Sequence, residues 1–126
     1  MKLKTLFIIT AVLFIINAPI ALITPGTQLS LYGISTGPGE NYMAQWAGLG
    51  SITVALIAWF ARNHTKSEVR QSIVLTLLIY FILGFVISVI GTLSGAMNAI
   101  GWSLVIIYFL FTLGYAYFLL KKPINH

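Results

Sequence analysis

Residues 71–120 read QSIVLTLLIYFILGFVISVI (71–90), GTLSGAMNAI (91–100) and GWSLVIIYFLFTLGYAYFLL (101–120), fifty consecutive residues without a charged side chain. As a single helix this stretch would be about 75 Å long, whereas the hydrocarbon core of a bilayer is about 30 Å thick. It must therefore turn back on itself, and the small and turn-forming residues at 94–101 mark the turn. The stretch predicts two membrane-spanning helices, over about 71–93 and 101–120.

Two further apolar stretches precede this pair. They predict spans over about 5–24 and 43–62, joined by an outer loop at 25–42, with an inner loop at 63–70 before the third span. Hydrophobic residues make up 59% of the chain and charged residues 7%, whereas roughly a quarter of the residues in a soluble domain are charged. We therefore expect residues 1–126 to form a single domain, an all-α integral membrane four-helix transmembrane bundle.

The basic residues predict the orientation of this bundle. All seven fall into three clusters, namely Lys2 with Lys4, Arg62 with Lys66 and Arg70, and Lys121 with Lys122. With four spans, the three clusters share one side, and Lys/Arg-rich segments stay in the cytoplasm. Both termini are thus predicted to be cytoplasmic. The net charge of +5 is expected to face membrane lipids with anionic headgroups, not nucleic acid.

The N-terminal stretch has a second interpretation, because Lys2 and Lys4 followed by an apolar run also resemble a signal peptide. Cleavage would leave three spans. The run is longer than the usual apolar region of about 7 to 15 residues in such peptides, and no clear small-x-small site follows it. These features favour a retained first span.

Small residues indicate how the helices pack. The hydrophobic effect does not drive helices together within lipid, so they associate through close backbone packing, which small residues allow. The second span carries a seam of Ala44, Gly48, Ser51, Ala55 and Ala58. The third span carries a comparable stripe of Ser72, Thr76, Tyr80, Gly84, Ser88, Gly91 and Gly95. Both are predicted to face other helices.

Several polar residues are candidates either for ligand contact or for packing. Within the spans they are Asn17, Gln45, Tyr80, Tyr108, Thr112 and Tyr115, and at the entrance to the second span stands Glu40. One interpretation is a cavity lined by hydroxyls and amides, with Glu40 as a gate. The other is ordinary interhelical hydrogen bonding, with Glu40 favourably placed before a helix N-terminus. We also expect Ser67 to cap the start of the third span.

The residues that catalysis and metal binding require are scarce. The chain has no cysteine, two acidic residues and two histidines, and no Asp, Glu, Lys, Arg or His lies in the interior of a span, where such residues mark ion pathways and proton relays. We therefore predict no catalytic residues, no cofactor and no metal site, which favours a non-enzyme over an enzyme.

The first half of the chain resembles small bacterial four-helix membrane proteins of the DoxX-like kind. The resemblance rests on Leu31-Tyr32-Gly33-Ile34-Ser35, on Met43-Ala44-Gln45-Trp46-Ala47-Gly48-Leu49-Gly50 and on Ala58-Trp59-Phe60-Ala61-Arg62. It implies the four-helix fold and a bacterial inner membrane, and Gln45 stands where an arginine is common in those families. It implies no site residues.

Three functions follow as hypotheses. The first is an accessory, assembly or helix-packing subunit that associates with other membrane proteins or with itself. The second is a binder or passive conduit for a small neutral or lipophilic molecule in the bundle core. The third, weaker hypothesis is a quinone-associated subunit. A filled interior would favour the first, whereas an open cavity reached from the outer loop would favour the second.

Overall fold

The computed structural model describes residues 2–64 and 66–120. Its helices are α1 (Leu3–Ile23), α2 (Pro25–Leu31), α3 (Pro38–Ala61), α4 (Ser67–Leu93) and α5 (Gly101–Leu120). Four of them, α1, α3, α4 and α5, are long and apolar enough to cross a membrane. The prediction of an all-helical chain with four such helices is confirmed.

Two of the helices begin earlier than the apolar pattern indicated. α3 begins at Pro38 instead of near residue 43, because a proline at the first helical position has its φ already set and needs no hydrogen bond for its nitrogen. α4 begins at Ser67 instead of near residue 71. The predicted Ser67 cap is wrong, since the cap position is Lys66 and no side chain caps the helix there.

The outer loop also contains a helix that was not expected. Thr24 accepts hydrogen bonds from the backbone of Thr27 and Gln28, and Pro25 again occupies the first turn, so residues 25–31 form α2. The outer segment is therefore one short helix, an irregular stretch and the first turn of α3.

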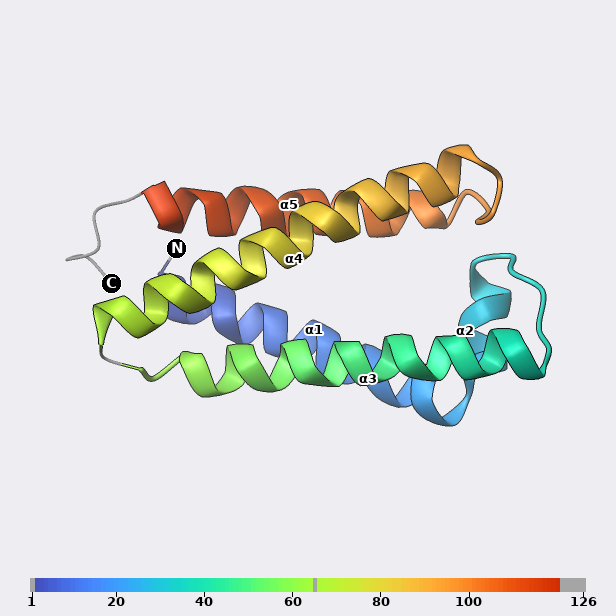
Figure 1. The fold of residues 1–126 in the computed structure, drawn as a ribbon, viewed down its shortest axis with the longest axis horizontal. Coiled ribbons are helices and arrows are strands. Elements are labelled where there is room, and N and C mark those ends of the chain that lie inside the picture. The colour runs from blue at the N-terminus through green and yellow to red at the C-terminus, as the bar shows by residue number, and fades with distance from the viewer. Residues whose placement is uncertain (1, 65, 121–126) are drawn as a thin grey trace.

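The helices are arranged as two antiparallel hairpins (Figure 1). α1 packs most extensively on α3, and α4 packs most extensively on α5. The backbones of the two hairpins approach each other much less closely. Residues 24–37 and 94–100, which connect the helices within each hairpin, lie at the same end of the molecule, which we call the loop end.

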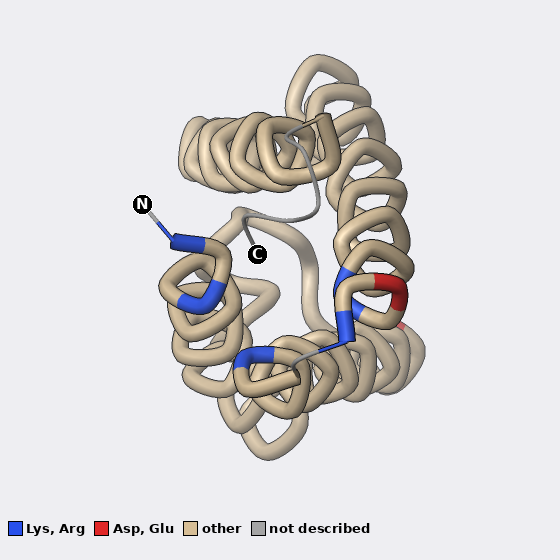
Figure 2. Tube along the Cα trace, turned by 90° about the vertical axis from the view of Figure 1, so that its left-hand side faces the viewer, with Lys and Arg blue, Asp and Glu red and all other residues tan. Residues whose placement is uncertain are grey.

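The opposite end carries the positive charge, and we call it the basic end. The described basic residues lie there, on α1, at the close of α3 and at the start of α4 (Figure 2). They are Lys2, Lys4, Arg62, Lys66 and Arg70. The third predicted cluster, Lys121 and Lys122, lies outside the described residues.

The seam of small residues in α3 is confirmed. Its five members, Ala44, Gly48, Ser51, Ala55 and Ala58, are all buried. Steps of four and three residues alternate along it, which keeps the stripe on one face of a helix. A β-carbon built on Gly48 would lie 2.9 Å from Cβ of Ala21 and 2.9 Å from Cγ of Leu22. The close approach of α1 and α3 therefore depends on glycine at this position.

The stripe predicted on α4 is right only for its middle part, because Gly95 lies beyond the end of the helix and is exposed. Ser88 is buried and Gly84 contacts the ring of Tyr108, but Ser72 and Thr76 are exposed. Each step of four residues turns by about 40° beyond a full turn, so a stripe built only of such steps winds around the helix. Near the basic end, the buried face of α4 is instead formed by Val74, Leu77, Leu78 and Phe81.

The hydrophobic core that joins the hairpins lies toward the basic end. The core extends from there to the middle of the bundle, where Phe14 of α1, Phe81 of α4 and Phe111 of α5 meet with ring centroids 4.8 to 6.2 Å apart. α3 contributes small residues such as Ala55 and Ala58. Long side chains thus bridge the distance between hairpins whose backbones stay apart.

A second connection joins the hairpins at the loop end. The Asn98 side chain donates to the Leu31 carbonyl at 3.2 Å, and the Asn98 amide donates to the Tyr32 carbonyl at 2.8 Å. Gly33, with a φ of 71°, packs directly against Asn98. Burial raises the pKa of the Tyr32 phenol, and a hydrogen bond with the Ser103 side chain lowers this pKa by a smaller amount. We call this set of contacts the Asn98 clasp.

Removing the Asn98 side chain should loosen the clasp. Asn98→Ala deletes the bond to Leu31 and the bond that Asn98 Oδ1 accepts from the Ile100 amide. We expect the free energy of unfolding to fall by about 1 kcal/mol, with faster hydrogen exchange at the Asn98 amide. Ser94→Ala is the control, because the Ser94 hydroxyl bonds only the Gly91 carbonyl of its own helix end. Equal exchange rates at Asn98 in the wild-type and Asn98→Ala chains would show that the backbone bond alone holds the clasp.

Candidate functional site

The predicted amide candidates connect α1 to its neighbours. Asn17 donates to Ser51 Oγ at 3.0 Å and accepts from Gln28 Nε2 at 3.1 Å, which links α1, α2 and α3. Gln45 donates to the Leu22 carbonyl at 3.2 Å. The structure thus brings Asn17 and Gln45 to the same interface between α1 and α3. Their polar atoms are used in joining helices.

The predicted hydroxyl candidates lie elsewhere, between α5 and the helices it faces. Tyr115 is fully buried and its hydroxyl lies 2.6 Å from Thr10 Oγ1 of α1. The Tyr108 hydroxyl lies 3.2 Å from the Tyr80 hydroxyl of α4. Thr112 donates to the Tyr108 carbonyl at 2.7 Å, within its own helix. These hydroxyls find partners among themselves or on the backbone.

Aromatic rings fill the space around these hydroxyls. The Phe81 ring stacks on the rings of Phe111 and Tyr115, with centroid distances of 4.8 and 5.7 Å. Phe14 and Tyr80 make edge-to-face contacts with the same ring. Phe81 and Tyr115 are both completely inaccessible to solvent. The half of the bundle toward the basic end is therefore closed by side chains.

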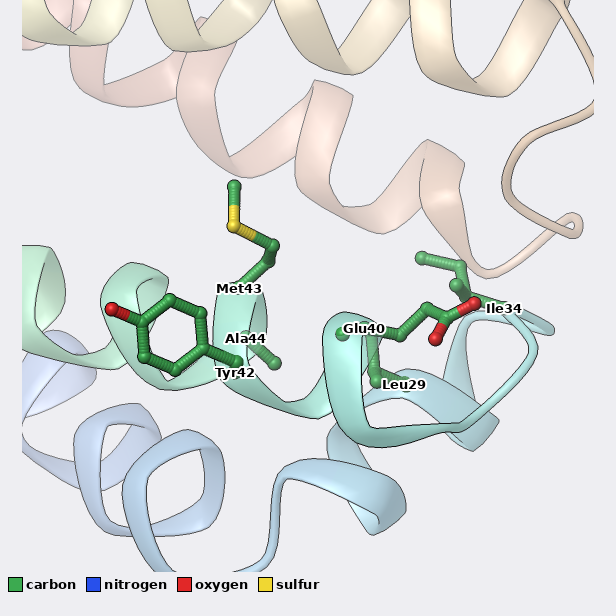
Figure 3. Close-up of a pocket in the computed structure, with 7 residues that line it drawn as sticks. Leu29, Ile34, Glu40, Tyr42, Met43 and Ala44 are labelled. Carbon is green, nitrogen blue, oxygen red and sulfur yellow. The ribbon is translucent and has the colours of Figure 1, made fainter.

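An open groove lies in the other half, at the loop end (Figure 3). The groove is shallow and wide open, and its volume is about 750 Å³. Its lining residues are Leu29, Ile34, Gly39, Glu40, Tyr42, Met43 and Ala44. Most of them are apolar, and all come from α2, the stretch after it and the start of α3.

The side chains of the groove are arranged so that charge and apolar surface are separated. Met43 points from α3 toward the α4–α5 hairpin, while the Glu40 carboxylate extends in another direction, toward Ile34 (Figure 3). Met43 keeps 66% of its surface exposed and Tyr42 58%. A molecule in this groove would contact mostly apolar side chains and one carboxylate.

Glu40 is the one predicted candidate that lines this groove. The described basic residues all lie at the basic end (Figure 2), so in that part of the chain no cationic side chain stands near Glu40. Its position in the first turn of α3 favours negative charge, since the backbone amides there carry partial positive charge. The carboxylate can therefore accept hydrogen bonds from a ligand.

Met43 and Ile34 were not among the sequence candidates, although they belong to the groove. Because the second span was expected to start near residue 43, Glu40 was placed outside the helix. Pro38 was the signal that could have placed it, because a helix beginning there puts Glu40 and Met43, three residues apart, on one face.

The chain was compared with protein-family models, with curated proteins and with solved structures, and none of them matches it. The DoxX-like resemblance therefore stays a prediction from the residues alone.

Proposed function

We propose that this chain is a multi-pass membrane protein with cytoplasmic termini, without catalytic activity of its own, that binds a lipophilic molecule in the groove at the loop end. The observation that carries this proposal is the contrast between the two halves of the bundle. An apolar groove is open at the loop end, whereas packed aromatic rings close the bundle toward the basic end.

The same contrast favours a binder over a conduit. A conduit needs a continuous path, but the stacked rings of Phe81, Phe111 and Tyr115 stand across the bundle between the groove and the basic end. A molecule that enters the groove would be held at the outer side of the membrane and would leave by the same opening.

The proposed orientation follows from the basic end. Lys and Arg gather there on three helices (Figure 2), and the rule that such segments stay cytoplasmic puts the loop end outside. The resemblance to DoxX-like proteins supports a bacterial inner membrane. Since the chain has no cysteine, single variants Ser35→Cys and Asn63→Cys can report the orientation. A membrane-impermeant maleimide on intact cells should label only Ser35→Cys, and labelling of only Asn63→Cys would reverse the orientation.

Binding in the groove can be tested by filling it. Gly39 lines the groove, and a β-carbon built on it meets no atom within 4 Å, so Gly39→Trp should occupy the space without disturbing α3. Gly50 has equally open surroundings on the same helix, away from the groove lining, and Gly50→Trp is the matched control. Native mass spectrometry of the chain extracted from its membrane should show a bound lipophilic molecule that Gly39→Trp loses and Gly50→Trp retains. Retention in both variants would contradict the proposal.

A second candidate function is a helix-packing subunit, and one observation favours it. Gly50 lies on an exposed face of α3 beside Trp46 and Leu49, which are 56% and 46% exposed. Exposed glycine lets another helix approach closely. Crosslinking in native membranes should then capture a partner that Gly50→Trp loses and Gly39→Trp retains, the reverse of the ligand result.

A further inference from the structure

We infer that the molecule held in the groove is a phospholipid whose headgroup ends in a primary ammonium, with Glu40 binding the ammonium and the acyl chains lying along the apolar lining. This inference rests on the proposed function and names the ligand class of the same groove.

The charge of the groove selects the headgroup. Glu40 is one of only two acidic residues in the chain, and the other, Glu68, lies in the first turn of α4 at the basic end. Among the described residues, no Lys or Arg lies at the loop end (Figure 2). A carboxylate only accepts hydrogen bonds. A ligand that supplies both positive charge and N–H donors therefore complements Glu40 best.

The depth of Glu40 fits a headgroup. α3 has 24 residues, about 36 Å at 1.5 Å per residue, which exceeds the hydrocarbon thickness of about 30 Å. The first turn of α3 therefore reaches the headgroup layer, while Met43 one turn further along faces the acyl layer. Tyr42 and Trp46 flank this level, as aromatic residues commonly do at the interface.

Other lipid classes match these features less well. A choline headgroup is positive but has no N–H to donate to the Glu40 carboxylate. A phosphatidylglycerol headgroup is negative, so Glu40 repels it, and the basic end at the opposite side of the bundle is the surface suited to it. An ethanolamine headgroup provides three N–H donors and a charge-assisted hydrogen bond.

The preference can be measured on the full-length chain in detergent by native mass spectrometry. The probes are phosphatidylethanolamine, phosphatidylcholine and phosphatidylglycerol with identical acyl chains. We expect the wild-type chain to bind phosphatidylethanolamine about fivefold more tightly than phosphatidylcholine, the upper range for a solvent-accessible charge pair. Glu40→Gln keeps the shape of the side chain and should abolish this difference.

Glu68→Gln is the matched control, because it removes the other carboxylate from the opposite end. It should leave the preference for phosphatidylethanolamine unchanged. Equal binding of ethanolamine and choline lipids by the wild-type chain would overturn the inference. A preference that survives Glu40→Gln, or that Glu68→Gln abolishes, would overturn it as well.

The Gly39→Trp variant separates failure of this inference from failure of the proposed function. If Gly39→Trp removes bound phospholipid but the wild-type chain shows no headgroup preference, the groove binds lipophilic molecules and only the role of Glu40 is wrong. If Gly39→Trp and Glu40→Gln both leave the binding of every probe lipid unchanged, the groove is not a phospholipid site and this inference fails. The proposed function fails as well only if Gly39→Trp also retains the lipophilic molecule that is extracted with the wild-type chain.

Discussion

Replacing Gly48 by leucine is expected to separate α1 from α3 and to cause a large loss of stability. A β-carbon at this position would lie 2.9 Å from side-chain atoms of Ala21 and Leu22 and 3.2 Å from the backbone nitrogen of Leu22. The backbone of α1 cannot move away without breaking its own packing. We expect a loss of about 3 kcal/mol or more for Gly48→Leu and about 1 to 2 kcal/mol for Gly48→Ala.

Gly50 offers a matched control two residues further along the same helix. A β-carbon built there meets no atom within 4 Å, so Gly50→Leu should change the free energy of unfolding by less than about 0.5 kcal/mol. Unfolding in mixed micelles of increasing denaturing-detergent content measures all three variants. If Gly48→Leu and Gly50→Leu unfold at the same detergent fraction, the close contact of α1 with α3 does not contribute to the free energy of unfolding.

Truncating Phe81 to alanine is expected to loosen the connection between the hairpins. The Phe81 ring is fully buried. Its centroid lies 5.7 Å from the ring centroid of Phe14 in α1, and 4.8 and 5.7 Å from those of Phe111 and Tyr115 in α5. Its loss leaves a cavity where the helices meet. We expect a cost of about 3 kcal/mol, at the lower end of the range for phenylalanine truncation, because unfolded helices in a membrane do not expose the ring to water.

Phe60→Ala is the control for this change. Phe60 is 70% exposed on α3, so the same atoms are removed without opening a cavity in the core. Thermal unfolding in detergent should show a lower transition temperature for Phe81→Ala than for Phe60→Ala. Equal transition temperatures would mean that the ring cluster does not hold the hairpins together.

These two positions explain why the bundle is closed at one end and open at the other. Small residues such as Gly48 and Ala58 let α1 and α3 pack closely along their length. Large rings around Phe81 fill the space between hairpins only toward the basic end. At the loop end the Asn98 clasp connects the hairpins, and the groove lies beside α3. The proposed ligand would occupy the space that side chains leave there.

Part of the candidate site could be predicted from the sequence. Glu40 stood out because it is the only charged residue of the outer segment, and it does line the groove. The hydroxyl residues such as Tyr80 and Tyr108 also stood out, but they hydrogen-bond each other within the packed half. Hydrophobic lining residues such as Met43 could not be distinguished from lipid-facing residues, because both are apolar and exposed.

The number of long helices was determined by the sequence alone, because the cost of placing charge in hydrocarbon and the length of a helix per residue depend only on residue type and count. The seam of α3 was likewise determined, because alternating steps of four and three residues stay on one helical face whatever that face meets. Tertiary structure decided which face of α4 is buried along its length and where the groove opens. Both depend on contacts between residues far apart in the chain, such as Phe14 with Phe81 and Tyr32 with Asn98, and such contacts leave no periodic pattern along the sequence.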